Sequence, residues 1–445
     1  MLAFRLLFQV PAPPMSSPSP PHAAADLSAQ AAALARQGRM AESIALWRRV
    51  LALEPGNARA LNQVGAHALA HGDLLGARAH LERAIAADPG LAIAHANLAR
   101  VSAFAGDTDG ALRCLDAALR ADPTAWGAHF EKAQLLEAQG RNREAGFAWT
   151  RGLQYLPEEA AQVPNLQPTL ARARQGEARM NAEMAALFDE NLRDLGAGSG
   201  KREMERMDHA VDVITGRRGL ATSRPLMLPI PRLPSIPFFH PGDYPWTARV
   251  EAAFPEILSE LNGLLESREG FVPYVQTAEG QPAGQFQPLD RTMDWSAFFL
   301  RKDGRRVDAN ADRCPATEAA LEHAPQIVNP GRAPVSFFSA LRPGVHIPPH
   351  NGATNARLTV HLPLIIPPDC ALRVGGETRQ WQPGKLLMFD DTIRHEAWNR
   401  SDRLRVVLIF DIWHPMLTDL EKEAITRMVG VMVSYYGNDG DLGEL

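Results

Sequence analysis

Two histidines in the carboxy-terminal half of the sequence are the best candidates for metal ligands. His350 and His395 stand 45 residues apart (395 − 350), next to apolar, strand-like runs. A redox metal such as Fe(II) takes neutral imidazole nitrogens as donors and needs open positions for a co-substrate and dioxygen. Short strands joined by Pro-Gly and Gly-Gly turns favour a β-sandwich around such a site. We therefore predict that His350 and His395 bind a metal ion.

An arginine follows the second histidine at a short distance in the sequence. Arg405 follows His395 by ten residues (405 − 395) and begins an apolar run. That spacing places Arg405 one strand deeper than the histidine. A guanidinium at such a depth can clamp a buried carboxylate through two parallel hydrogen bonds.

Four sequence blocks around these residues, 338–352, 357–364, 389–398 and 403–415, resemble the aspartyl/asparaginyl β-hydroxylase family. The resemblance extends over residues 226–415 and includes weaker matches at 244–246 and 294–296. It implies a double-stranded β-helix, or jelly roll, in which the two matching histidines bind Fe(II), with 2-oxoglutarate as co-substrate and dioxygen as oxidant. It also implies that Arg405 and Ser339 hold the distal carboxylate of 2-oxoglutarate and that His361 contacts its oxalyl end.

The third metal-ligand position is a glycine. Most iron oxygenases place a carboxylate two residues after the first histidine, whereas this chain has Gly352 there, which offers no side chain. Members of the aspartyl/asparaginyl β-hydroxylase family also lack that carboxylate. Asp391, four residues before His395, matches an aspartate that the family places beside the metal ligands without binding the metal directly, which implies that Asp391 holds a metal-bound water in the vacant position. Asp391 is therefore our predicted catalytic residue, and the alternative is that Asp390 and Asp391 are plain turn residues.

A second departure concerns the oxalyl end of the co-substrate. Family members often have the pattern R-L-R-x-H, and this chain has Arg357, then Thr359 in place of the second arginine, then His361. These three residues share one face of a strand, on which Arg357 lies about 6.6 Å further along than Thr359. Arg357 stays among the predicted co-substrate ligands, and whether it replaces the missing arginine is left open.

A structural role is the alternative for several of these side chains. Histidines such as His346, His361 and His414 are often buried and hydrogen-bonded without any metal. Tryptophan usually supplies aromatic bulk to a core or to a pocket wall. We keep Trp295 as a predicted wall of the co-substrate pocket. The other tryptophans of this half with the same alternative are Trp381, Trp398 and Trp413.

Strand-like runs and one helix are expected to position the site. Prolines are dense from 229 to 241, and an amphipathic helix is predicted at 246–266. The predicted strands are 335–341, 357–366, 372–374, 385–389 and 403–413.

The amino-terminal part is periodic. The recurring positions have a step of 34 residues (72 − 38, 106 − 72, 140 − 106), and they resemble the tetratricopeptide repeat. We predict four helix-turn-helix units with a glycine in each turn, a small residue at the close contact and a proline after the second helix. The concave surface of such an array is expected to bind a peptide or partner protein; the alternative is that the array serves as a scaffold or oligomerisation arm. The recurring residues of the repeats are the glycines Gly38, Gly72, Gly106 and Gly140, the small residues Ser43, Ala77, Ala111 and Ala145, and the prolines Pro55, Pro89, Pro123 and Pro157.

Length and composition indicate an ordinary globular protein of several domains. The chain has 445 residues, 45% of them hydrophobic, and a net charge of −5, which argues against a nucleic-acid binder. Three scattered cysteines, no convincing signal peptide and no long apolar run indicate a reducing cytoplasm and no transmembrane segment. The predicted domains are a Pro-rich disordered terminus (1–25), the repeats (26–159), a helical connector (160–225), the oxygenase domain (226–420) and a C-terminal helix and tail (421–445).

The sequence therefore predicts an Fe(II)- and 2-oxoglutarate-dependent dioxygenase that hydroxylates a C–H bond. The resemblance favours the β-carbon of aspartyl or asparaginyl residues in a peptide or protein substrate, recruited by the repeats. Two alternatives stay open. One is a non-protein substrate, such as a lipid acyl chain or a free amino acid. The other is a catalytically silent interaction protein. The oligomeric state is not predicted.

Overall fold

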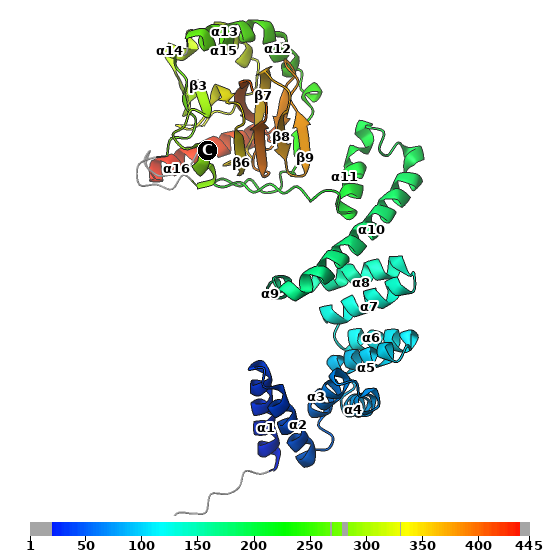
Figure 1. Cartoon of the computed structure of the whole chain (residues 1–445). Helices are drawn as coiled ribbons and strands as arrows, with labels where there is room; N and C mark the ends of the chain where they lie inside the picture. Colours follow the sequence, from blue (N-terminus) through cyan, green and yellow to red (C-terminus); the bar gives the residue numbers. More distant parts are fainter. Residues whose placement is uncertain (1–19, 268, 278–283, 330, 437–445) are drawn as a thin grey trace, which may run out of the picture. The chain divides into compact units, whose positions relative to one another are not determined.

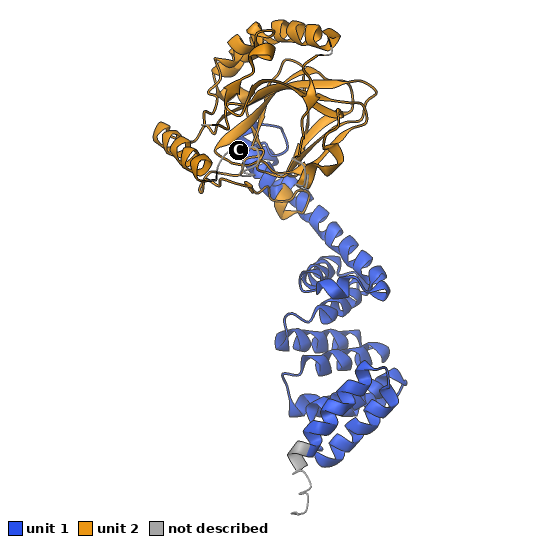
Figure 2. Ribbon diagram, turned by 90° about the vertical axis from the view of Figure 1, so that its left-hand side faces the viewer, with its two compact units in different colours: residues 1–211 blue, residues 212–445 orange. Residues whose placement is uncertain are grey.

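The computed structural model describes residues 20–267, 269–277, 284–329 and 331–436 (Figure 1). The chain divides into two compact units, Met1–Val211 and Asp212–Leu445 (Figure 2). The predicted boundary at 225 lies inside the second unit, because Arg218 already forms an ion pair with Glu377 there. None of the described helices has the length and apolar character that crossing a membrane requires.

Unit 1 consists of helices that pack in consecutive pairs, as the repeat pattern predicts. Each pair turns at a repeat glycine, and all of these glycines have a positive φ between 74° and 80°, a conformation that glycine adopts without strain. The small residues Ser43, Ala77, Ala111 and Ala145 are at most 1% exposed. The paired helices are α1 (Pro20–Arg36), α2 (Met40–Leu53), α3 (Ala58–Ala70), α4 (Leu74–Ala87), α5 (Ala92–Phe104), α6 (Thr108–Ala121), α7 (Trp126–Ala138) and α8 (Asn142–Gln154).

The two ends of the array differ in part from expectation. Helix α1 begins at Pro20, inside the stretch 1–25 predicted to be disordered, and residues 1–19 lie outside the described part. The connector is helical only up to Ile214, and the proline-containing chain after it is extended. Its helices are α9 (Glu158–Ala161), α10 (Gln167–Asn191) and α11 (Glu205–Ile214), with short 3-10 turns at Pro164–Leu166, Arg193–Leu195 and Arg202–Met204.

Unit 2 contains two β-sheets that face each other. The larger sheet consists of β1 (Phe238–Phe239), β2 (Val272–Pro273), β3 (Trp295–Lys302), β4 (Arg305–Arg306), β5 (Ser336–Leu341), β7 (Arg357–Ile365), β10 (Leu387–Phe389) and β12 (Arg405–Trp413). The smaller sheet consists of β6 (His346–His350), β8 (Cys370–Val374), β9 (Glu377–Gln380) and β11 (His395–Asn399). The strand orders are β1-β10-β7-β12-β5-β3-β2, with β4 on β3, and β6-β11-β8-β9. The predicted double-stranded β-helix after a helical array is confirmed.

Helices cover the outer face of the larger sheet (Figure 1). One core lies between α12, α13, α15 and the outward residues of β5, β7 and β12. The single helix predicted at 246–266 is instead two helices, because the first ends at Ala252 and the second begins at Phe254. Pro255, which lacks an amide hydrogen, lies in the first turn of the second helix, where no such hydrogen bond is needed. The helices of this unit are α12 (Trp246–Ala252), α13 (Phe254–Ser267), α14 (Asp308–Ala311), α15 (Pro315–Leu321) and α16 (Asp419–Tyr436), with 3-10 turns at Pro241–Asp243 and Gly284–Leu289.

The alternation of side chains along the larger sheet decides which residues reach the interior between the sheets. On β12, Val406, Leu408 and Phe410 belong to the outer, helix-covered core. Arg405 and Val407 therefore face the smaller sheet, since successive side chains of a strand point to opposite faces. The same alternation turns one face of β7, with Arg357, Thr359 and His361, toward the interior. Charged and polar groups that are buried between two sheets need partners or a ligand.

A candidate metal and co-substrate site

The two predicted metal ligands lie side by side on the smaller sheet. His350 ends β6, His395 begins β11, and the two residues are direct cross-strand partners. Their ring centroids are 3.9 Å apart. Two imidazoles that are this close can contribute nitrogen donors to one metal ion. The sequence did not predict β6 or β11 as strands; β6 contains Pro348 and Pro349, and it is the edge of its sheet, where prolines are tolerated.

Hydrogen bonds orient both imidazoles in the same way. His350 Nδ1–H donates to the carbonyl of Pro348 at 2.8 Å, and His395 Nδ1–H donates to that of Ile393 at 3.1 Å. Since a carbonyl only accepts, each ring keeps its Nε2 lone pair for another partner. Burial is the main reason that the pKa of His350 is lowered to about 3 and that of His395 to about 4. Both rings are therefore neutral at physiological pH, as metal donors must be.

Arg405 is a buried cation on the larger sheet. The side chain is 1% exposed, and burial lowers its pKa to about 9, so it stays charged at neutral pH. Its guanidinium carbon lies 4.1 Å from the ring centre of Trp381, and Nη1 donates to Ser339 Oγ at 3.4 Å. Among the described residues no carboxylate forms an ion pair with it, and its Nε has no hydrogen-bond partner. A buried cation with unused donors fits an anionic ligand.

Ser339, Trp295 and His361 complete the surroundings of Arg405. Trp295 Nε1 donates to Ser339 Oγ at 3.0 Å, and its ring stacks on that of Tyr274 with the ring centroids 4.0 Å apart, so Trp295 orients the serine. Its role as a wall of the co-substrate pocket stays a prediction. His361 Nδ1 accepts a hydrogen bond from Trp381 Nε1 at 3.1 Å. The pKa of His361 is well below its usual value because of burial and then the charge of Arg405. His361 is thus neutral, with its Nε2–H left as a donor.

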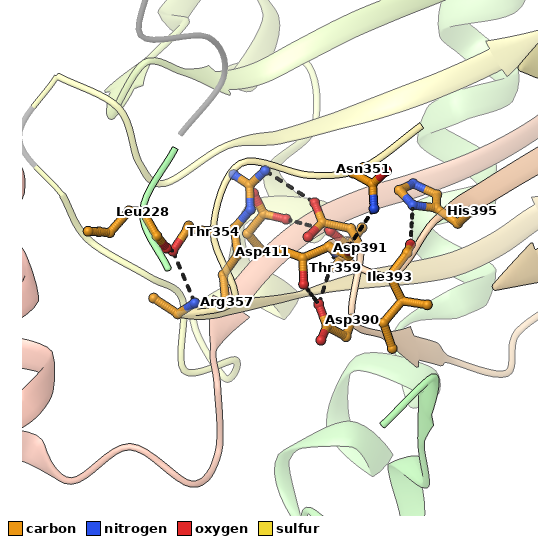
Figure 3. Close-up of polar contacts among 12 residues, drawn as sticks. Leu228, Asn351, Thr354, Arg357, Thr359, Asp390, Asp391, Ile393, His395 and Asp411 are labelled. Carbon is orange, nitrogen blue, oxygen red and sulfur yellow. Dashed lines mark hydrogen bonds and ion pairs between the residues drawn. The ribbon is translucent and has the colours of Figure 1, made fainter. Parts of the chain in front are cut away.

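Arg357 lies between two aspartates instead of standing alone (Figure 3). Its Nη1 donates to Asp411 Oδ2 at 2.9 Å and its Nη2 to Asp391 Oδ2 at 3.3 Å. The hydroxyl of Thr359, which stands in place of a second arginine, donates to Asp411 Oδ1 at 3.2 Å. The guanidinium is thus already shared by two carboxylates, and these hydrogen bonds give Arg357 a role in placing Asp391. Binding of the oxalyl group by Arg357 stays a prediction.

The carboxylate of Asp391 fills the space beside Gly352. A Cβ atom at residue 352 would lie 2.3 Å from the Asp391 carboxylate, so no other residue fits there without displacing it. The backbone joins the two residues as well, because Gly352 N donates to the carbonyl of Asp391 at 2.7 Å. Asp391 Oδ1 is buried and has no hydrogen-bond partner among the described residues. The position from which a third ligand normally extends is therefore taken by a neighbouring acid.

Three residues near the site were not singled out from the sequence. Phe389 packs against His361 and His395, with ring centroids 5.0 and 5.3 Å away, and Phe286 lies edge-on to His350 at 4.7 Å. Asp411 is the third of these residues. A carboxylate inside an otherwise apolar strand is unusual, and this could have identified Asp411 from the sequence. Aromatic residues gave no such signal, because every β-sandwich core contains them.

The remaining candidate histidines lie apart from this site. His346 Nε2 contacts Glu396 at 2.7 Å, and half of its side chain is exposed. His414 is fully buried, its ring packs edge-on against Phe239 at 5.4 Å, and burial lowers its pKa to about 4. In the described part of the chain, no group of three or more His, Cys, Asp or Glu side chains has a metal-binding arrangement. The donors that fit a metal ion here are the two neutral imidazoles, His350 and His395.

Comparisons with known proteins agree with this geometry. The aspartyl/asparaginyl beta-hydroxylase family model matches residues 251–415, and tetratricopeptide-repeat models match residues 28–92, 68–124 and 97–163. The human aspartyl/asparaginyl beta-hydroxylase is 35% identical over 184 residues, which are 41% of this chain and 24% of that protein. The match therefore spans about a quarter of the length of that curated relative.

Two further relatives are similar over a comparable share of the chain. The ornithine lipid ester-linked acyl 2-hydroxylase of Rhizobium tropici is 34% identical over 200 residues, 44% of this chain and 67% of that enzyme. The human aspartate beta-hydroxylase domain-containing protein 1 is 35% identical over 211 residues, 46% of this chain and 52% of that protein. With its repeat array, its β-sandwich and these matches, the chain belongs to the aspartyl/asparaginyl β-hydroxylase family and carries amino-terminal tetratricopeptide repeats.

Proposed function

We propose that this protein is an Fe(II)- and 2-oxoglutarate-dependent hydroxylase of a C–H bond. The observation that carries the proposal is the pairing of two neutral imidazoles, His350 and His395, with a buried arginine that has no carboxylate partner among the described residues. The two imidazoles suit a metal ion, and the buried arginine suits the carboxylate of an organic acid. Family membership supports the same pair of ligands.

In this proposal each side chain has one task. His350 and His395 hold the iron through Nε2, while Arg405 and Ser339 bind the distal carboxylate of 2-oxoglutarate. His361 donates its Nε2–H to an oxygen of the oxalyl end, since Trp381 occupies the other ring nitrogen. When bound, iron and 2-oxoglutarate supply the oxidation: dioxygen gives one oxygen atom to succinate, with loss of CO2, and one to the substrate C–H bond.

Asp391 has a positioning task beside the iron ligands. Its Oδ2 is held by Arg357, and its Oδ1 is left to accept a hydrogen bond from a water bound near the histidines. Asp411 and Thr359 fix the other side of the same guanidinium. Buried between the sheets, this network keeps the acid in one place, so that it does not itself have to reorganise during the reaction.

For the substrate we propose first an aspartyl or asparaginyl β-carbon in a peptide or protein. The family model and the human relative support this class. A lipid acyl chain is the second candidate, because the lipid hydroxylase from Rhizobium tropici matches over two thirds of its own length. The two candidates differ in whether the hydroxylated molecule is a polypeptide or a lipid.

The test is conversion of 2-oxoglutarate by the purified full-length protein. We expect succinate to form with added Fe(II) and to stop when a chelator removes the metal. Peptides with aspartyl or asparaginyl residues and vesicles containing an acylated amino-acid lipid are then offered separately, and mass spectrometry reports which gains 16 Da. Succinate formation that is independent of iron, or absent in every mixture, would contradict the proposal.

We further propose that the array recruits a polypeptide substrate. Between α5, α6 and α7 lies a hollow of about 470 Å³ lined by Arg100, Phe104 and Glu131, among others, and Phe104 is 74% exposed at it. An exposed aromatic at a hollow is a typical anchor for a partner chain.

Changing this anchor should separate a protein substrate from a short peptide. We expect Phe104→Ala to lower kcat/KM for a full protein substrate by roughly fivefold or more and to leave a short peptide from it unchanged. Phe147, 57% exposed on α8, provides the matched control as Phe147→Ala. Equal turnover of the protein substrate by both variants would leave the array a scaffold or oligomerisation role.

A further inference from the structure

An extended segment of unit 2, which we call the strap (residues 223–230), runs beside the two loops next to the histidines. Its amide of Arg224 donates to the carbonyl of Thr392 at 2.8 Å, and its amide of Leu226 donates to that of Gly352 at 3.1 Å. Thr392 lies in the loop before His395, and Gly352 lies in the loop after His350. One short segment is therefore bonded to both loops, although it precedes them by more than a hundred residues in the sequence.

The prolines of the strap fit this bonding pattern. The backbone amides of residues 224, 226, 227, 228 and 230 all donate to one of the two loops. Pro225 and Pro229 of the strap fall between these donors, and Pro231 comes directly after the strap. Because proline has no amide hydrogen and a fixed φ, it stiffens the segment at these positions without the loss of a bond. These three prolines thus have a structural reason.

Side chains of the loops clamp the same strap. Asn355 Oδ1 accepts from Ile230 N at 2.7 Å, and its Nδ2 donates to the Ile230 carbonyl at 3.0 Å, as a paired strand would. Thr354 Oγ1 donates to the carbonyl of Leu228 at 2.7 Å, and both residues are labelled in Figure 3. At the other end the hydroxyls of Ser223 and Thr392 are 2.6 Å apart.

The ladder between β6 and β11 does not by itself fix the histidines. Its register shifts between His395 and Ala397, so the pairing is irregular at the residues that must face the metal. A bulge of this kind bends the strand and leaves the local geometry to neighbouring contacts. Strand β8 supplies such contacts to β11 through its regular pairing, and the strap and the loops supply the others. Additional links between the loops are Asn351 Nδ2 to the Thr392 carbonyl at 2.7 Å and Gly352 N to the Asp391 carbonyl.

We propose that the strap is a positioning segment for the metal site: it holds the loops of His350 and His395 at the separation that one metal ion requires. This inference rests on the proposed function. The strap lies outside residues 251–415, the part of the chain that the family model matches. Groups that orient metal ligands without touching the metal change affinity by about 10–100-fold when removed.

The experiment compares two asparagine variants in the full-length chain. Asn355 follows His350 by five residues (355 − 350), and Asn355→Ala removes both of its hydrogen bonds to the backbone of Ile230. Asn310→Ala is the matched control, because Asn310 Nδ2 donates to the Phe299 carbonyl at 2.8 Å, away from the strap. Co(II) binding, followed by its absorption spectrum, gives the metal dissociation constant, and thermal unfolding gives the stability of each variant. We expect Asn355→Ala to weaken Co(II) binding about tenfold and to alter the spectrum, while Asn310→Ala changes neither.

A second variant and a metal-free measurement keep the test decisive. Thr354→Val preserves shape, removes the bond to Leu228, and should act in the same direction as Asn355→Ala. In the metal-free chain, amide hydrogen exchange of the strap donors should rise in both variants and stay unchanged in Asn310→Ala. Wild-type Co(II) affinity in both variants would overturn the strap proposal. A wild-type chain that binds no Co(II) would overturn the proposed function instead, and unchanged exchange in both variants would then overturn the strap proposal as well.

Discussion

Replacement of either metal-site histidine should abolish stoichiometric metal binding. His350→Ala or His395→Ala removes one of only two proposed protein donors, so we expect affinity for Fe(II) or Co(II) to fall by more than about 100-fold, since even changes around a metal's ligands often cost 10–100-fold. Succinate formation from 2-oxoglutarate should fall to background. Metal content after desalting, together with turnover, measures both effects.

His346→Ala is the matched control, because His346 lies on the same strand β6. Its ring contacts Glu396, on the neighbouring strand, and its side chain is half exposed. We expect the control to retain full metal content and turnover. If a folded His350→Ala or His395→Ala protein kept one metal ion per chain, the ligand assignment would be wrong.

Replacement of Arg405 should separate co-substrate binding from metal binding. Arg405→Met removes the buried charge but retains much of the bulk against Trp381. Hydrogen bonds to charged groups contribute roughly 1.5–3 kcal/mol, and about 1.4 kcal/mol corresponds to a factor of ten. We therefore expect the KM for 2-oxoglutarate to rise by roughly 10–100-fold with Co(II) affinity unchanged. The KM of Arg405→Lys for 2-oxoglutarate should lie between those of the wild type and Arg405→Met, because an ammonium keeps the charge but does not reproduce the bidentate geometry.

Arg373→Met is the control for a lost arginine. Arg373 lies on β8, pairs with Glu396, and its side chain is 51% exposed. Its removal should leave the KM for 2-oxoglutarate unchanged. An unaltered KM in Arg405→Met as well would show that another residue binds the distal carboxylate.

The sequence allowed prediction of those features that depend on residue type and period. The 34-residue step gave the helix pairs and their turn glycines, because each repeat uses the same local geometry. The positions of His350, His395, Ser339 and Arg405 followed from blocks whose residues the structure brings to the interior of one sandwich. Their assigned roles as ligands stay predictions that the experiments above test.

Other features depend on register and long-range contact, which period alone does not reveal. His346 and His350 are four residues apart, so a regular strand would place them on one face, yet the irregular pairing separates them. Likewise, Asp411 meets Thr359 only because β7 and β12 pair at that register. The partner of Arg357 was hidden for the same reason: Asp411 is 54 positions away in the sequence.

The strap also changes where this catalytic unit begins as a transferable module. The family match starts at 251, yet residues 223–230 are bonded to the loops beside both histidines. Arg218, still earlier, is paired with Glu377 of β9. A gene fusion or an expression fragment that started at the family boundary would therefore separate the metal site from part of its support. Residues 212–230 are part of unit 2 rather than a spacer, and exchange of the repeat array for another domain must leave them in place.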